Sequence, residues 1–194
     1  MKISLFAAAA ALAIALPSAS PAVAQDASAM AGTMTASDVG ASPMMGVSAT
    51  DYVKMAADGD MYEIASSKLA VTKTKNEGLK GFAREMITDH MQTTKTLMAA
   101  LKNGDRTIAP PSKAMSAENA ANVALLKKAP KGNFDQLYMQ QQLAAHQKAW
   151  SLHKGYATDG TDATLKQIAA TAVPVIEKHI AHLKGMMGGT AGTM

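Results

Sequence analysis

Histidine is the residue type in this chain that most directly suggests chemistry. The five histidines, His90, His146, His153, His179 and His182, all lie inside long amphipathic stretches. Imidazole is the commonest transition-metal ligand among side chains, and it transfers protons near neutral pH. If packing brings these imidazoles together they form a site, and if it does not they fill the core. Cysteine is absent from the sequence, which excludes thiolate ligands and disulfides.

The elements that must position these histidines are four long helices, predicted from apolar residues at three- and four-residue spacing. The first covers 51–72, and the second runs from Glu77, after an N-cap at Asn76, to Lys102. The third runs from an N-cap at Asn133 to Thr158, and the fourth from Thr161 or Asp162 to the glycines Gly185, Gly188 and Gly189. A long connection over 105–132 separates the second helix from the third and holds a short helix over 117–126, capped by Ser116. No strand pattern competes, so the sequence predicts an all-α four-helix bundle.

The two ends of the chain differ from this helical region. Residues 1–24 have a basic Lys2, an apolar run over 5–16 and an Ala22-Val23-Ala24 site, which together indicate a secretory signal peptide. We therefore expect cleavage after Ala24 and export to the periplasm, with secretion as the alternative. Residues 25–47 predict a disordered tether before the domain at 48–187, and 188–194 a flexible tail. No later apolar run is long enough to span a membrane.

Charge and composition exclude several function classes. The chain has 19 basic and 15 acidic residues, and the lysines are scattered rather than clustered, so we expect no nucleic-acid partner. Ser66, Ser67 and Ser151 lie inside predicted helices without a glycine-rich elbow, which argues against a serine nucleophile. These features favour a non-enzymatic binding or stress-related protein.

Three segments carry a family resemblance. They are M-x-x-D-H over Met86 to His90, F-D-x-x-Y-x(7)-H over Phe134 to His146, and the stretch from Pro174 to His179. In this order, within Ala49 to Lys184, the chain resembles a bacterial family of exported ferritin-like proteins of uncharacterised function, often labelled outer membrane or exported proteins. The resemblance implies a ferritin-like four-helix bundle and no settled reaction.

One polar residue on each long helix falls near the middle of the predicted bundle. These candidate metal ligands are Glu63, His90, His146 and His179, with His182 as a weaker candidate and Asp89 and Glu177 as possible neighbours. Imidazole and carboxylate suit zinc, iron or copper. One hypothesis is therefore a metal-binding or redox protein that uses this cluster.

The cluster departs from the pattern of a di-iron centre. Ferritin-like di-iron sites use two Glu-x-x-His pairs, which place both ligands on one helix face. The residues three positions before His90, His146 and His179 are instead Ile87, Leu143 and Ile176. A mononuclear or histidine-rich site therefore fits this sequence better than a di-iron site.

Two further interpretations stay open from sequence. In the first, Glu63 pairs with one core histidine only to fix helix register, while His153 and His182 are partly exposed. Asp89 points about 100° away from His90 on a helix, so we expect it to meet Lys or Arg.

The second interpretation concerns methionine. Several methionines lie near the chain ends: Met30, Met34, Met44, Met45, Met186, Met187 and Met194. Thioethers bind Cu(I), so the ends could handle copper. The alternative is that low-complexity ends accumulate methionine without a function.

Overall fold

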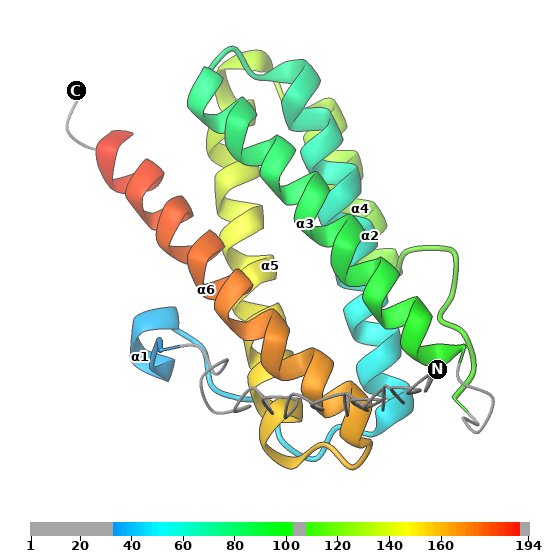
Figure 1. Ribbon diagram of the computed structural model, residues 1–194. Helices are drawn as coiled ribbons and strands as arrows, with labels where there is room; N and C mark the ends of the chain where they lie inside the picture. The colour runs from blue at the N-terminus through cyan, green and yellow to red at the C-terminus, as the bar shows by residue number, and fades with distance from the viewer. Residues whose placement is uncertain (1–32, 103–107, 191–194) are drawn as a thin grey trace, which may run out of the picture.

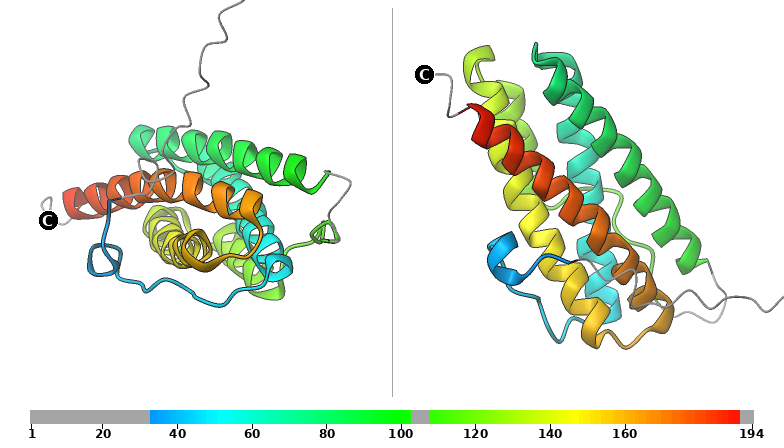
Figure 2. Two further views of the ribbon diagram at one scale, coloured as in Figure 1. Left: turned by 60° about the horizontal axis from the view of Figure 1, so that its bottom comes forward. Right: turned by 60° about the vertical axis from the view of Figure 1, so that its left-hand side comes forward.

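The computed structural model describes residues 33–102 and 108–190, and all regular elements in these ranges are helices. Four long helices lie side by side: α2 (Ala49–Lys73), α3 (Glu77–Leu101), α5 (Lys131–Asp159) and α6 (Ala163–Thr190) (Figure 1). Two shorter helices, α1 (Ala36–Val39) and α4 (Ala117–Lys128), lie outside them. Helix α2 packs on α3 and α5, and α6 packs on α5 and α3, so the four long helices surround one interior (Figure 2). The all-α prediction is confirmed.

Side-chain caps explain where most helices begin. Asn76 Oδ1 accepts a hydrogen bond from the Leu79 backbone N–H at 3.1 Å, and Asp162 Oδ1 accepts one from the Leu165 N–H at 2.9 Å. The predicted N-cap at Asn133 is wrong, because α5 begins at Lys131 after Pro130. Pro130 is the N-cap residue of α5 and makes no side-chain cap hydrogen bond.

Residues 33–47 are packed rather than disordered, contrary to the expectation for 25–47. Val39 is fully buried, and its carbonyl oxygen accepts a hydrogen bond from Gln147 Nε2 at 2.8 Å. The Met44 N–H donates to the Ser151 carbonyl oxygen at 2.8 Å. Helix α5 carries Gly155 at this crossing, where a Cβ would lie 1.9 Å from the Met44 carbonyl oxygen. The absence of a side chain at Gly155 therefore lets this segment lie on α5.

Only some of the remaining predictions for the chain ends concern residues that the structure describes. Helix α6 continues to Thr190, past the glycines Gly185, Gly188 and Gly189 that were expected to end it, which shortens the expected tail at 188–194 from its N-terminal side. The predicted signal peptide over 1–24, residues 25–32 and residues 191–194 lie outside the described residues. Among the helices of the described ranges, none combines the length and apolarity needed to cross a membrane.

Helix α4, predicted within the long connection, is held against α2 at both of its ends. At its start, Asp58 accepts hydrogen bonds from the Ser116 backbone N–H at 2.7 Å and from Asn119 Nδ2 at 2.9 Å. At its end, Lys73 Nζ donates to the carbonyl oxygens of Leu126 and Lys127 at 2.9 and 2.8 Å. A cation at these carbonyls satisfies groups that a helix end otherwise leaves without partners.

Two of the three apolar clusters of the described residues lie toward opposite ends of the interior. The Phe82 cluster comprises Ala70, Leu79, Phe82, Ala83, Met86, Leu126, Phe134, Tyr138, Met139 and Leu183. The Tyr52 cluster comprises Tyr52, Val53, Ala56, Ala57, Leu97, Leu152, Tyr156, Leu165 and Ala169. Between these two clusters, buried polar side chains from all four long helices build the candidate site.

Candidate metal site

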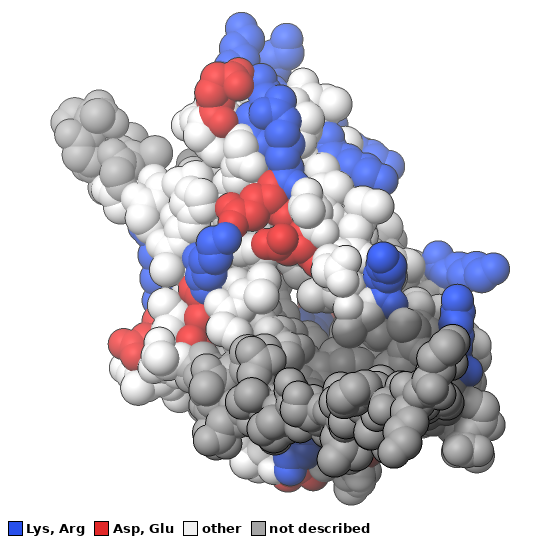
Figure 3. Space-filling model, viewed as in Figure 1, with Lys and Arg blue, Asp and Glu red and all other residues white. Residues whose placement is uncertain are grey.

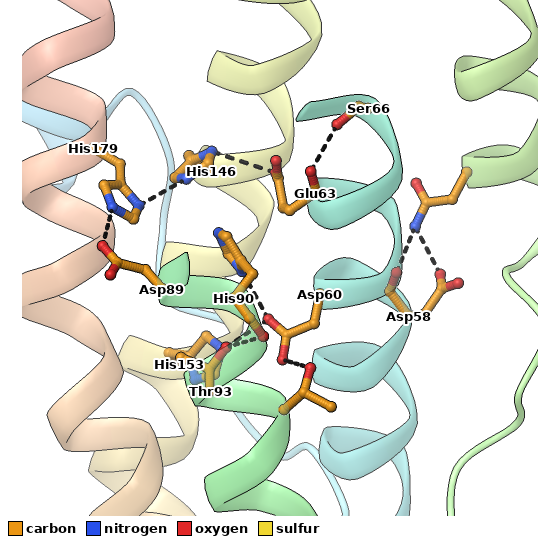
Figure 4. Close-up of polar contacts among 12 residues, drawn as sticks. Asp58, Asp60, Glu63, Ser66, Asp89, His90, Thr93, His146, His153 and His179 are labelled. Carbon is orange, nitrogen blue, oxygen red and sulfur yellow. Dashed lines mark hydrogen bonds and ion pairs between the residues drawn. The ribbon is translucent and has the colours of Figure 1, made fainter. Parts of the chain in front are cut away.

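A layer of buried polar side chains crosses the interior between the two apolar clusters (Figure 4). This polar layer consists of Asp60 and Glu63 on α2, His90 on α3, Gln142 and His146 on α5, and His179 on α6. Each of these residues is at most 8% exposed. Burying a polar group costs free energy unless a hydrogen bond or an opposite charge compensates, so the partners of these groups define what the layer can do.

Three histidines from three helices meet at the centre of the layer. The ring centroids of His90 and His146 lie 5.7 Å apart, those of His90 and His179 5.9 Å apart, and those of His146 and His179 5.3 Å apart. One ring nitrogen from each histidine lies within 4.8 Å of one from each of the others. This buried group, the histidine triad, could hold a metal ion.

Asp60 orients the first of these rings. His90 Nδ1 lies 2.7 Å from Asp60 Oδ1, and the hydroxyls of Thr93 and Thr94 each donate to the same carboxylate at 2.9 Å. A carboxylate that already receives two hydroxyl hydrogens is an acceptor, so Nδ1 of His90 carries a hydrogen. The other ring nitrogen, Nε2, is buried and has no hydrogen-bond partner among the described residues. In Figure 4 the ring extends from α3 toward His146 and His179.

The other two rings are oriented in the same way. His146 Nδ1 lies 2.8 Å from the carbonyl oxygen of Gln142, and His179 Nε2 lies 3.0 Å from Asp89 Oδ2. A carbonyl oxygen cannot donate, and a carboxylate accepts, so these two nitrogens carry the ring hydrogens. The nitrogens left over, His146 Nε2 and His179 Nδ1, face each other at 3.2 Å (Figure 4).

The result is a set of imidazole lone pairs without a donor between them. A neutral imidazole has one N–H and one lone pair, so His146 Nε2 and His179 Nδ1 present two lone pairs to each other. At 3.2 Å these lone pairs repel unless a positive charge lies beside them. A proton or a metal ion supplies that charge.

The pKa values of the three rings differ for stated reasons. Burial lowers the pKa of His146 well below its usual value, and it also lowers the pKa of His179. Burial acts in the same direction on His90, but the hydrogen bond to Asp60 and the charge of Glu63 outweigh it and raise the pKa of His90. In the absence of a metal, a shared proton therefore resides most readily on His90, while the other two rings stay neutral as metal binding requires.

The comparisons with known proteins assign the chain to a family. Residues 33–186 match a family described as a domain of unknown function, DUF4142. The chain belongs to the DUF4142 family. No curated protein matches this DUF4142 chain significantly. Its structure is similar to the crystal structure of a DUF305 fragment from Deinococcus radiodurans, with a TM-score of 0.63 and 15% identity over 75% of this chain and 99% of that one. At this identity the likeness shows a shared helical fold alone.

Glu63 of the DUF4142 domain lies beside the histidine triad and is not a member of it. Its Oε1 lies 3.4 Å from His146 Nδ1, the nitrogen that Gln142 already holds, and its Oε2 has no hydrogen-bond partner in the described part of the chain. Burial raises the pKa of Glu63 to about 7, although the charge of His90 opposes the shift. The sequence predicted a contact between Glu63 and a core histidine. This contact is present between Glu63 and His146, at the long distance of 3.4 Å.

His182 lies outside the triad, on the surface where α3 and α6 meet. Its side chain is 45% exposed, and its Nδ1 lies 3.6 Å from Glu85 Oε2, while Lys178 Nζ binds the other oxygen of Glu85 at 2.5 Å. Charged side chains of both signs gather on this face of the DUF4142 domain (Figure 3). Asp89 is half-buried here and accepts from His179, not from the Lys or Arg that the sequence suggested.

Glu177 also lies apart from the triad. Its carboxylate accepts hydrogen bonds from Trp150 Nε1 at 2.9 Å and from the Met34 backbone N–H at 3.0 Å. Glu177 therefore fastens the N-terminal segment to α5 and α6 instead of joining the metal candidates.

The methionines of the expected tails are largely tied to the fold. Met34 and Met44 pack against apolar clusters of the core, as do Met186 and Met187. Met45 is 54% exposed, and Met30 and Met194 lie outside the described residues. The packed thioethers act as core residues, whereas the alternative to a copper-handling role expected methionines without packing constraints at these ends.

A cavity of about 750 Å³ is lined by His90 and His179 of the triad, but not by His146, and by residues of the α4 region. His90 and His179 lie at its inner end, and Ser116 and Asn119 of the α4 region line the other end. The exposed Lys148 also lines it, so the cavity reaches the surface. The triad is therefore buried but accessible from one side.

Sequence reasoning missed the residues that orient the triad. Asp60 was not among the candidates, although it follows Val53 and Ala56 at helical spacing and so shares their inward face. The roles of Thr93 and Thr94 had no sequence signal, because threonines on a helix usually bond to their own backbone.

Proposed function

We propose that this DUF4142 protein binds one transition-metal ion through His90 Nε2, His146 Nε2 and His179 Nδ1. The observation that carries this proposal is the orientation of the triad. Each ring has one nitrogen fixed by an acceptor, Asp60, the Gln142 carbonyl or Asp89, and one nitrogen left toward the shared centre. Metal-bound histidines have this arrangement, in which an acceptor on the outer N–H fixes the tautomer and strengthens the ligand.

The spacing within the triad suits a metal ion. Two ligands at the zinc–nitrogen bond length of about 2.0–2.1 Å, held at a tetrahedral angle, lie about 3.3 Å apart. His146 Nε2 and His179 Nδ1 lie 3.2 Å apart. Small ring movements of His90, whose Nε2 has no other partner, complete the set.

The surrounding charge suits a divalent ion. The Asp60 and Asp89 carboxylates contact the rings from outside, and Glu63 lies within 3.4 Å of His146. No lysine or arginine is paired with these three carboxylates in the described residues. A bound cation would therefore compensate both the lone pairs and the carboxylates at once.

Imidazole ligands fit zinc, copper or iron. The missing Glu-x-x-His pairs support one ion rather than a di-iron pair. We propose that the ion is bound in a ferritin-like bundle of the periplasm. The signal-like leader supports the location, and the order of the four long helices supports the fold.

A second function rests on the same 3.2 Å contact. If a proton on His90, and not a metal, compensates the lone pairs of His146 and His179, the polar layer serves only to fix the register of the helices, and the protein is a non-enzymatic binding or stress-related bundle. Buried polar groups have this role in some helical proteins.

Metal analysis separates the two functions. We expect protein purified from its native compartment, or metal-free protein given Zn²⁺, Co²⁺ or Cu²⁺, to hold one ion per chain and to melt at a higher temperature. His146→Leu should abolish both effects. The matched control, His182→Leu, removes an exposed histidine outside the triad and should leave both unchanged. Protein that takes up none of these ions, nor Fe²⁺, at micromolar concentrations would leave the register-fixing function instead.

A further inference from the structure

The histidine triad supplies three ligands, and its surroundings bear on what occupies the fourth position of the metal. Among the described residues, no fourth histidine or carboxylate oxygen joins the triad's group of converging atoms. His90 and His179 instead line the inner end of the cavity. Metal sites with three protein ligands and an open position hold water or an exogenous molecule there, whereas structural sites are closed by four.

We propose that the cavity binds a small uncharged molecule, which coordinates the metal through a nitrogen or oxygen lone pair and donates an N–H or O–H to Glu63. This inference rests on the proposed metal site and adds its ligand. The volume of about 750 Å³ lies in the range of small-molecule sites.

The walls of the inner cavity explain why the ligand is uncharged. Leu152, Val175 and Ile176 line it with apolar side chains, and Asp60, Glu63 and Asp89 add carboxyl groups. The two lysines that line the cavity, Lys54 and Lys148, are both exposed, so they lie at its outer rim. An anion would meet these carboxylates without a cationic partner at the inner end.

Glu63 supplies the second anchor. It lines the cavity, it is 3% exposed, and its Oε2 has no hydrogen-bond partner in the described residues. A buried carboxyl oxygen without a partner is costly, and a ligand N–H or O–H would satisfy it. Imidazole is a suitable probe because it carries one lone-pair nitrogen and one N–H.

A glycine provides a way to close the cavity without touching the site. Gly59 lies on α2 and lines the cavity, and a Cβ added there meets no atom within 4 Å. In Gly59→Phe the ring would enter the cavity. Gly81 on α3 is also helical, exposed and free of contacts at its Cβ, but it does not line the cavity. Gly81→Phe is therefore the matched control.

The experiment follows the visible spectrum of the Co²⁺-loaded full-length protein during titration with imidazole, N-methylimidazole and azide. We expect imidazole to bind at least tenfold more tightly than azide, and N-methylimidazole, which lacks the N–H, to bind several-fold more weakly than imidazole. Gly59→Phe should keep its Co²⁺ and lose imidazole affinity at least tenfold, whereas Gly81→Phe should behave as the parent protein.

The outcomes are distinct. Parent protein that fails to bind Co²⁺ would contradict the metal site itself. Co²⁺-loaded protein that does not respond to imidazole, or responds equally to azide, would contradict only the open position and its preference. Unchanged imidazole binding in Gly59→Phe would show that imidazole does not bind in the cavity. Equal binding of imidazole and N-methylimidazole would show that Glu63 is not the second anchor.

Discussion

The Tyr52 cluster and the polar layer are neighbours inside the same four helices, but different forces hold them together. In the Tyr52 cluster, Leu165 and Tyr52 are fully buried, and the Tyr52 and Tyr156 rings stack at 4.1 Å. Apolar burial is not directional and contributes roughly 25 cal/mol per Å². The cluster therefore stabilises the fold whichever way its side chains turn, provided that they fill the space.

The polar layer, in contrast, depends on the directions of its hydrogen bonds. His90 and Asp60 must meet at 2.7 Å, and His146 must reach both Gln142 and His179. Even so, Glu63 Oε2, His90 Nε2 and Gln142 Oε1 are buried without hydrogen-bond partners in the described residues. Such atoms cost free energy. The apolar clusters therefore provide the stability that lets the polar layer keep atoms available for a ligand.

The largest expected effect lies in the apolar cluster. Leu165 is fully buried, so Leu165→Ala should lower the free energy of unfolding by about 2–5 kcal/mol through lost burial and a new cavity. Chemical denaturation of metal-free protein measures this loss. A loss of less than about 1 kcal/mol would show that the Tyr52 cluster is not the main source of stability.

The next effect lies in the polar layer and depends on pH. Burial raises the pKa of Glu63 from 4.5 to about 7, so folded protein binds more protons than unfolded protein between these values, and stability due to Glu63 falls as pH rises through this range. Glu63→Gln removes the ionisation. It should therefore stabilise metal-free protein more at pH 8 than at pH 4.5, by up to about 3 kcal/mol. Denaturation curves of both proteins at the two pH values test this, and an equal effect at both would refute it.

A smaller effect is expected for the residue that orients His90. Asp60→Asn keeps the size of the side chain but removes the charge that fixes the His90 tautomer. We expect metal affinity to fall about 10–100-fold, as for other outer partners of ligating histidines. Competition with a chromophoric chelator measures the affinity. If Asp60→Asn matched the parent, the orientation of His90 would not depend on this contact.

The smallest effect is expected one contact further out. Thr94→Val removes the hydroxyl that donates to Asp60 Oδ2. The hydrogen bonds of Asp60 with Thr93 and with His90 remain. Metal affinity should fall less than tenfold, in line with about 1 kcal/mol for one hydrogen bond. The same chelator assay compares Thr94→Val with Asp60→Asn. A larger loss for the threonine would reverse the proposed order of importance.

Much of the fold was predictable, because helix signals are local. The N-cap at Asn76 and the short helix capped by Ser116 depend on side chains within three residues of the cap, and both predictions are confirmed. The order in residues 33–47 was not predictable. It depends on contacts with Gln147 and Ser151, more than 100 residues away in sequence, and the composition of the segment gave no sign of them.

The candidate site likewise has features that local sequence signals predict and features that depend on long-range contacts. Helical periodicity alone placed His90, His146 and His179 on inward faces at similar depth, because the spacing of apolar neighbours fixes which face of a helix is buried. Three further features follow from contacts between helices: which ring nitrogens converge, that Asp60 and Asp89 orient the rings, and that Glu63 and His182 lie outside the triad. These outcomes depend on ångström-scale distances between helices and on side-chain rotamers, and residue spacing within one helix carries no information about either.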